Sequence, residues 1–352
     1  MRSSYKESDV TILLKDITGT VEPQPAEVRE KLIQAGRHYC EMLPLEYRPA
    51  QEYISLYNRS LDENAKITAD AAAVLSERIY RRYGSNITLV SLARAGTPAG
   101  IIIKRYLNRR YPEINVSHYT ISIIRGRGID ANAMKYILAR HEASSICFVD
   151  GWTGKGAILD TLRRELASYE GVPDELAVLA DPAHITDLCG TREDFLIPSS
   201  CLNATVSGLM SRTFLRSDII GENDFHGAVY YSEMESEDRS NEFIDRVTDM
   251  IDFTKSYETC DESPADHAGF EEVVRIKNDF RVSDINFVKP GIGETTRVLL
   301  RRIPWKILVS DKKDKRHLEH ILELAREKNV EIQEYPLGCY RSCGIIKNLS
   351  DI

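Results

Sequence analysis

The sequence predicts an α/β protein built on a doubly wound, mostly parallel sheet, with N-terminal helices and a small C-terminal α/β domain. Between residues 86 and 180, short apolar runs alternate with helical patterns, as in chains that form parallel sheets. Polar, glycine-containing turns follow these runs at 93–100, 125–132, 150–156 and 181–194. Ligands of such sheets bind at the carboxyl ends of the strands, so a functional site is expected at these turns.

The N-terminal part is predicted to be mainly helical. Residues 9–17 form a short apolar segment that suits a strand or an extended arm. Helical spacing of apolar residues follows at 26–41, and further helices are expected at 51–57 and 65–83. The segment HYCEMLPLEYRP, which begins at His38, is unusually dense in aromatic and acidic residues.

The central part supplies the predicted sheet. Its strands are short and rich in β-branched residues, and they are expected at 86–92, 115–124, 146–149 and 176–179. The helices that connect them are expected through 103–111, at 134–140 and at 157–166. A further helix is predicted at 241–253, where apolar residues recur at helical spacing.

Two domains are predicted, at residues 1–258 and 270–352, joined by a linker at 259–269. Residues 270–280 and those that follow begin a small α/β unit, in which strands are expected at 305–310 and 330–335 and an amphipathic helix at 317–328. From Glu271 onward the chain has 16 Lys and Arg against 13 Asp and Glu, although the whole chain has a net charge of −8. Nine cations cluster there and could follow a nucleic-acid backbone, or could form a solvated face: Lys289, Arg297, Arg301, Arg302, Lys306, Lys312, Lys313, Lys315 and Arg316.

The composition is typical of a soluble cytoplasmic protein. Of the 352 residues, 42% are hydrophobic and 28% are charged, and no apolar run approaches membrane-spanning length. The N-terminus lacks the apolar core of a signal peptide. The seven cysteines form no CxxC pair, so reduced thiols are expected and zinc is not.

The turn after the strand at 146–149 is suited to an anion. Asp150 is followed by Gly151, Gly154 and Gly156, and a helix begins after the last glycine. Backbone N–H groups that converge on a helix N-terminus favour a phosphate. The glycine spacing matches neither a P-loop nor a dinucleotide fingerprint. A tight turn without any ligand, with Asp150 as a helix cap, is the alternative for this stretch taken alone.

Two segments carry a resemblance to a known family. SLARAGTP (91–98) resembles the pyrophosphate loop of type I phosphoribosyltransferases, and VDGWTGKG (149–156) resembles their phosphoribosyl-pyrophosphate loop. Together with HYCEMLP, these segments resemble a bacterial phosphoribosyltransferase family of tellurium-resistance (Ter)-type stress operons, over about residues 8–255. Residues 270–350 resemble the Pelota-type RNA-binding domain that is often fused to that family.

The resemblance implies a Mg²⁺-dependent phosphoribosyltransferase that joins phosphoribosyl pyrophosphate to a base-like acceptor, or runs the reverse reaction. Catalytic roles would fall to Asp150, Arg94, Arg125 and Arg127, with Asp150 holding the ribose directly or through Mg²⁺. The implied phosphate-binding residues are Ser91, Ala95, Gly96, Thr97, Gly151, Trp152, Thr153, Gly154, Lys155 and Gly156. The implied acceptor pocket contains His38, Tyr39, Glu41, Cys201, Asn203, Phe225 and His226. A homodimer, RNA binding through 270–352 and no membrane partner fit the same family.

Several features leave alternatives open. The family has a second acid where this chain has Gly151, and its loop is longer. Arg94 could make a strand-end ion pair instead, and Arg125 and Arg127 could lie on a solvated turn. A non-catalytic, phosphoribosyl-ligand-sensing RNA-binding regulator would use the same fold. A cysteine hydrolase that uses Cys201 with His226 is the third alternative, although no protease-specific local sequence surrounds either residue.

Overall fold

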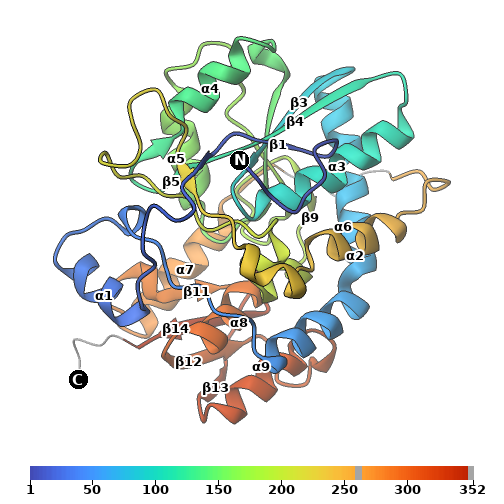
Figure 1. The fold of residues 1–352 in the computed structure, drawn as a ribbon. Helices are drawn as coiled ribbons and strands as arrows, with labels where there is room; N and C mark the ends of the chain where they lie inside the picture. Colours follow the sequence, from blue (N-terminus) through green and yellow to red (C-terminus); the bar gives the residue numbers. More distant parts are fainter. Residues whose placement is uncertain (258–263, 348–352) are drawn as a thin grey trace.

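The computed structural model describes residues 1–257 and 264–347, and a parallel sheet forms the centre of this part (Figure 1). Its strand order is β1–β4–β3–β7–β8–β9, and each neighbouring pair is parallel. The strands, in that order, are Thr11–Ile12, Asn115–Ile121, Asn86–Leu92, Ile146–Trp152, Leu176–Ala180 and Cys189–Thr191. The predicted α/β class is confirmed; a specifically phosphoribosyltransferase-like topology stays a prediction.

Helices cover both faces of the sheet because side chains alternate along each strand. On β3, Leu89 belongs to a core with α2 (Gln51–Tyr83), α3 (Gly96–Arg110) and α6 (Ser240–Asp249). The next residue, Val90, belongs to the opposite core with α4 (Ala131–Leu138) and α5 (Ala157–Leu166). The sheet is therefore doubly wound, as predicted.

Helix α2 is one helix of 33 residues, where two were predicted. The residues expected to separate them, 58–64, contain neither glycine nor proline, and Ser60 and Leu61 are buried. A polar stretch without a helix-breaking residue continues the helix when one of its faces packs. The extra length carries α2 from the sheet to the C-terminal unit, where Arg59 pairs with Glu323 at 3.0 Å.

Short elements connect the larger ones, and several differ from the predicted bounds. The helix predicted at 26–41 ends earlier, as α1 (Ala26–Gln34), and is followed by a 3₁₀ turn, η1 (Tyr39–Glu41). The strand predicted at 115–124 is interrupted at Ser122. The small strands pair as β2 (Lys15–Asp16) with β10 (Gly227–Ala228) and as β5 (Ile123–Ile124) with β6 (Gly128–Ile129). Further 3₁₀ turns are η2 (Ala143–Ser145), η3 (Pro198–Cys201), η4 (Ala204–Val206), η5 (Ser232–Glu237) and η6 (Ile285–Phe287).

The C-terminal unit has its own four-stranded sheet in the order β11–β14–β12–β13. Its strands, in that order, are Val288–Pro290, Ser342–Ile346, Pro304–Val309 and Glu331–Glu334, and its helices are α7 (Ala268–Asp279), α8 (Ile292–Arg301) and α9 (Lys315–Glu327). Residues 258–263, which include 259–263 of the predicted linker, lie outside the described residues. The rest of it bonds to the body, since the Ala265 N–H donates to Asp187 and the His267 N–H donates to the His184 carbonyl.

Polar groups fasten the C-terminal unit to the carboxyl end of the parallel sheet. The buried Asp194 accepts hydrogen bonds from the N–H groups of Ile292, at 3.0 Å, and Arg341, at 2.8 Å. Burial raises the pKa of Asp194 to about 6, although these bonds act in the opposite direction. The Tyr340 hydroxyl donates to the Gly154 carbonyl at 2.6 Å. The two units therefore share an extensive, partly charged contact.

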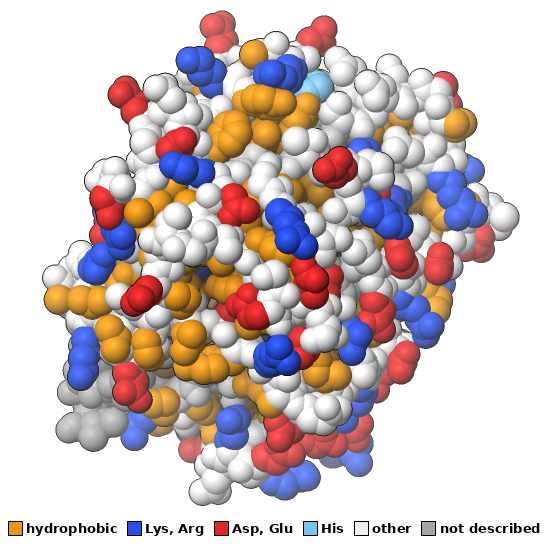
Figure 2. Space-filling view, in the orientation of Figure 1, with side chains coloured by type: hydrophobic (Ala, Val, Ile, Leu, Met, Phe, Trp, Pro, Cys, Tyr) orange, Lys and Arg blue, Asp and Glu red, His pale blue; other side chains and the backbone are white. Residues whose placement is uncertain are grey.

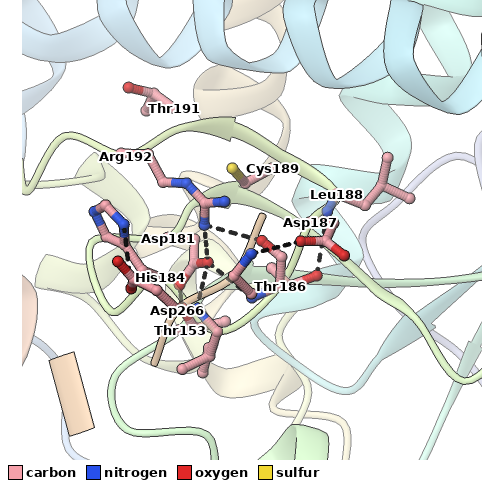
Figure 3. A network of polar contacts seen from close by, with 12 residues as sticks. Thr153, Asp181, His184, Thr186, Asp187, Leu188, Cys189, Thr191, Arg192 and Asp266 are labelled. Atoms are coloured by element: carbon pink, nitrogen blue, oxygen red, sulfur yellow. Dashed lines mark hydrogen bonds and ion pairs between the residues drawn. The ribbon is translucent and has the colours of Figure 1, made fainter. Parts of the chain in front are cut away.

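A second buried network holds the β7–α5 turn from the body side (Figure 3). Asp181 is fully buried and accepts from the Thr153 hydroxyl and the Arg192 guanidinium. It also accepts from the N–H groups of Ile185, at 2.8 Å, and Thr186, at 2.9 Å. Four donors satisfy this carboxylate, which is the condition for a stable buried charge.

No helix in the described residues is long and apolar enough to cross a membrane. On the face shown in Figure 2, Lys and Arg side chains are interspersed with Asp and Glu side chains.

Asp181→Ala should destabilise the fold by about 3–5 kcal/mol, because it leaves the buried Arg192 charge without this carboxylate and removes the acceptor of three further donors. Chemical denaturation at neutral pH measures this loss. Asp218→Ala is the matched control, since Asp218 pairs with Arg216 at the surface and should change stability little. Equal effects of the two substitutions would contradict a structural role for the Asp181 network.

Candidate active site

The predicted phosphate cradle at 150–156 is occupied by contacts with the C-terminal unit. Strand β7 continues through Trp152, three residues beyond its predicted end. Lys155 donates from Nζ to the carbonyls of Ile285, at 2.5 Å, and Val288, at 3.0 Å. A Cβ on Gly291 would lie 2.9 Å from the Trp152 ring, so the two units are in close contact there. The Lys155 side chain is therefore engaged by the C-terminal unit, and the Thr153 hydroxyl, which was expected to hold a phosphate, donates to Asp181.

The two ends of the predicted pyrophosphate loop face the interior, whereas Ala95 between them is exposed. The Ser91 hydroxyl lies 2.8 Å from Nε2 of the buried His118. Thr97 is buried and accepts from the Thr120 hydroxyl at 3.1 Å. At Gly96, a Cβ would overlap the Val149 carbonyl, so this glycine, next to Ala95, is required for the packing of α3 against β7. Helix packing explains SLARAGTP without a ligand.

Arg94 and Asp150, two predicted catalytic residues, have protein partners. Arg94 donates from Nη1 to the Met210 carbonyl at 2.7 Å and lies 4.0 Å from the Glu46 carboxylate. Asp150 accepts from the Gly151 N–H at 2.7 Å. Burial raises the pKa of Asp150 to about 6, while the nearby Arg297 favours its charged form.

The predicted acceptor pocket is divided among three places. Cys201 is buried at the contact with α8, where its carbonyl accepts from Arg301 at 3.2 Å and Asn203 accepts from the same guanidinium. Nδ1 of the His226 ring lies 2.8 Å from the Ser122 hydroxyl, and the backbone N–H of His226 donates to the Asp130 carboxylate. Phe225 packs beside Tyr136. In the described chain no contact joins Cys201 to His226, so these two do not form a thiol–imidazole pair.

The third place brings His38, Tyr39 and Glu41 together with the turn that carries Arg125 and Arg127. The Tyr39 hydroxyl accepts from the Arg125 N–H at 3.0 Å. Arg127 donates to Glu41 at 2.9 Å. Two groups of residues that the sequence assigned to different roles therefore form one site.

Cys40 lies at the centre of this site. Its Sγ is 2.9 Å from Nδ1 of His38, and the Cys40 N–H donates to the same nitrogen at 3.4 Å. Because Nδ1 accepts the backbone N–H, it is the unprotonated ring nitrogen, and the thiol proton is directed toward it. On its other side, Sγ lies 3.7 Å from the Leu215 carbonyl.

The electrostatic environment keeps both members of the pair neutral. Burial raises the pKa of the Cys40 thiol, and the nearby Arg127 opposes this effect. Burial lowers the pKa of His38, and Arg127 acts in the same direction, while a backbone hydrogen bond with Arg125 favours the protonated ring. A neutral imidazole beside a thiol is the state in which a general base can take the thiol proton.

A groove of about 1010 Å³ lies elsewhere, between α2 and α9. Charged residues of both signs line it, including Arg59, Glu63, Lys315 and Arg316. None of its lining residues belongs to the site around Cys40, so its volume does not bear on the chemistry of that site.

Magnesium was expected only through the resemblance. Among the described residues, no group of three or more His, Cys, Asp or Glu side chains is arranged to hold a metal ion. Asp150 has Gly151 beside it in place of a second acid, and Arg297 is its cationic neighbour. These residues do not fit a Mg²⁺ site, and a magnesium cofactor stays a prediction.

The sheet and the thiol–imidazole pair define an α/β protein with a site of the cysteine-hydrolase kind. A family model described as "Tellurite-like stress resistance cysteine protease StiP" matches residues 3–248, and one described as "PELOTA RNA binding domain" matches residues 267–348. A "Cysteine protease StiP" from Acinetobacter baylyi (strain ATCC 33305 / BD413 / ADP1) is 34% identical over 367 aligned residues, covering 98% of this chain and 94% of that protein. The chain belongs to the StiP family.

This membership shows that the phosphoribosyltransferase prediction is wrong. The physical reason is that SLARAGTP and VDGWTGKG resemble ligand loops in composition but are used here for packing and for the contact with the C-terminal unit. The alternative of a regulator that senses a phosphoribosyl ligand has the same weakness, because it relies on the same two loops as ligand-binding loops. The expected stress-resistance context and Pelota-type domain agree with the two family models.

The segment HYCEMLP was recognised from its sequence, but Cys40 was not predicted as a site residue. The signal was present, because His38 and Cys40 are two residues apart in a segment rich in polar and aromatic residues. Residues two apart do not face each other in a helix, and in a strand they share a face but lie roughly 6.6 Å apart. The two side chains meet here because the segment turns through η1, with His38 as its cap.

We expect Cys40 to react slowly with iodoacetamide near neutral pH and progressively faster above about pH 8.5, because its raised pKa leaves little thiolate, the reactive form. Mass spectrometry of each cysteine across this pH range measures the rate. Cys201, whose pKa burial raises to about 12, is the internal reference and should react later. Arg127→Ala should move the Cys40 midpoint to higher pH. A pH midpoint below about 8.5 for alkylation of Cys40 in the wild-type protein would contradict the raised pKa of this thiol.

Proposed function

We propose that the protein is a cysteine peptidase in which Cys40 is the nucleophile and His38 is the general base. The observation that carries this proposal is the 2.9 Å separation of Cys40 Sγ and His38 Nδ1. Membership of a family described as cysteine proteases supports it.

The pair can carry out both halves of peptide hydrolysis. His38 Nδ1 takes the thiol proton as Sγ attacks the peptide carbonyl, and the electron pair of the C=O bond moves to oxygen. The imidazolium then gives its proton to the departing amine as the C–N bond breaks, which leaves a thioester. Water, deprotonated by His38, releases the acid and restores the thiol. The positive charge of Arg127 stabilises the thiolate during these steps.

Cys40 is fully buried, so a peptide must displace part of its cover. Gly126 and Gly128, both with positive φ, belong to the turn that bonds to Tyr39 and Glu41. A Cβ on Gly126 would lie 3.7 Å from Nε2 of His38, so this turn lies directly beside the imidazole. Outward movement of the turn would open a path to the pair.

Cys40→Ala should lower peptide hydrolysis by roughly 1,000-fold or more, because no second nucleophile adjoins His38. His38→Ala should lower it by roughly 100-fold or more. Hydrolysis of a mixed peptide library, followed by mass spectrometry, gives the rates. Cys201→Ala is the matched control and should keep the activity if it melts at the wild-type temperature. Retention of hydrolysis by Cys40→Ala, or its loss in Cys201→Ala alone, would reject Cys40.

We also propose that the C-terminal unit binds RNA, which the Pelota-domain match supports. The basic cluster recognised in the sequence is divided in the fold. Lys289, Arg297 and Arg301 face the body, and Lys306 pairs with Glu331. Arg302 is exposed, and four further exposed cations lie at the start of α9 and just before it: Lys312, Lys313, Lys315 and Arg316.

Replacing Lys312, Lys313 and Arg316 by Ala should weaken RNA binding and reduce the slope of log K against log salt by about 2, because each lost phosphate contact removes roughly 0.7. Fluorescence anisotropy with single-stranded RNA at several salt concentrations measures both quantities. The control is Arg326→Ala with Lys328→Ala, at the exposed far end of the same helix. Unchanged binding by the triple variant would exclude this surface.

A further inference from the structure

Guanidinium groups gather beside Tyr39, the residue that precedes the proposed nucleophile. Arg212 lies over the Tyr39 ring, with Cζ 5.0 Å from the ring centroid. Arg94 is fixed to the same segment as Arg212, because it donates to the Met210 carbonyl. Among the described residues, the carboxylate that pairs with either guanidinium is Glu46, 4.0 Å from Arg94 and itself only 8% exposed. The group therefore has an excess of positive charge.

Arg212 is largely enclosed and lacks a counter-ion. In the described part of the chain its guanidinium has neither a hydrogen bond nor an ion pair, and its contact is the Tyr39 ring. Burial lowers the pKa of Arg212 to about 10, and the neighbouring Arg29 and Arg94 act in the same direction. A largely enclosed cation without a carboxylate partner is less stable than a paired one, so an anion that reached Arg212 would be bound well.

Tyr231 supplies an independent indication of a ligand. Its side chain is 4% exposed, and its hydroxyl is buried without a hydrogen-bond partner among residues 1–257 and 264–347. Burial raises the pKa of Tyr231 to about 12; Glu46 acts in the same direction, whereas Arg94 and Arg212 oppose it. The backbone brings Tyr231 to the same segment as the arginines, because the Tyr231 N–H donates to the Leu209 carbonyl at 2.9 Å and Arg94 donates to the Met210 carbonyl. The hydroxyl is therefore a free donor beside this segment. Buried polar groups are nearly always paired, so an unpaired one calls for an explanation.

We propose that Arg212, Arg94 and the Tyr231 hydroxyl form a subsite for a carboxylate of the peptide substrate, an acidic side chain close to the bond that Cys40 attacks. This inference rests on the proposed peptidase function. Arg212 also acts on the pKa of Cys40, which places the subsite next to the nucleophile. Two guanidinium groups and one hydroxyl provide the donors that a planar carboxylate accepts.

The enclosure of the subsite favours a single anionic group over a nucleic-acid backbone. Binding along a phosphate backbone requires a row of accessible cations. Arg125 and Arg127 are exposed beside Tyr39, but Arg127 is paired with Glu41, whereas Arg212 lies over the Tyr39 ring and is largely enclosed. The aromatic rings of Tyr39 and Tyr231 instead give the subsite the apolar walls of a side-chain pocket.

Binding and cleavage test the subsite separately. The full-length Cys40→Ala protein is titrated calorimetrically with peptides that carry one Glu, Gln or phosphoserine at each position in turn. The wild-type protein is assayed for cleavage of the same peptides. We expect the Glu peptide to bind about tenfold or more tightly than its Gln counterpart at one position, and to have a correspondingly lower KM.

Three substitutions separate charge, geometry and folding. Arg212→Met should reduce the ratio of the affinity for the Glu peptide to that for the Gln peptide to about one. Arg212→Lys should keep part of this preference. Tyr231→Phe removes a hydroxyl that has no partner in the protein, so stability should not fall while the ratio does. Arg163→Met, in a surface ion pair on α5, is the matched control and should keep the full ratio.

The outcomes distinguish the subsite from the peptidase. Cleavage without any Glu preference, unchanged in Arg212→Met, overturns the subsite and leaves the peptidase intact. Arg212-dependent binding of the Glu peptide without cleavage of any peptide supports the subsite and overturns the peptidase. A stronger preference for phosphoserine than for Glu overturns the assignment to a carboxylate. Loss of the ratio in Tyr231→Phe at an unchanged melting temperature supports the subsite even if Arg212→Met fails to fold.

Discussion

The contact between the β7–α5 turn and the C-terminal unit is the constraint on which the rest of this structure depends. A lysine and a carboxylate, Lys155 and Asp194, are withdrawn from water at this contact and bond to backbone groups of the opposite unit. Buried charges are tolerated only with such partners, so the two units are fixed relative to each other. The carboxyl edge of a parallel sheet, where ligands usually bind, is covered here by protein.

The candidate site lies at the same edge, where the segment that begins at His38 packs against the turn that follows β4 and β5. This segment lies between the turn at 125–128 and the chain at 212–216, which contributes the Leu215 carbonyl beside Cys40. The thiol and imidazole are neighbours in sequence, so their approach depends on one local turn, whereas their environment is assembled from remote segments. Burial, more than any single charge, sets the protonation of both groups.

Much of the fold could be predicted because periodicity is a local property. Strand β3 has its predicted bounds, 86–92, and α5 its predicted bounds, 157–166. Elements without a clear apolar period were missed, such as β9 and β14. Helix α8 was missed because a stretch of small and polar residues precedes its apolar face. The continuity of α2 was missed because buried Ser60 and Leu61 pack against other parts of the chain.

The sequence by itself determined the α/β class, the layering of helices on both faces and the importance of HYCEMLP, since these follow from spacing and composition. Only the tertiary structure decided what the polar loops do. Glycine-rich turns after strands are equally suited to a phosphate and to close packing of another unit, because both require small residues and free N–H groups. Which of the two occurs depends on what lies opposite, and at 150–156 this is the C-terminal unit.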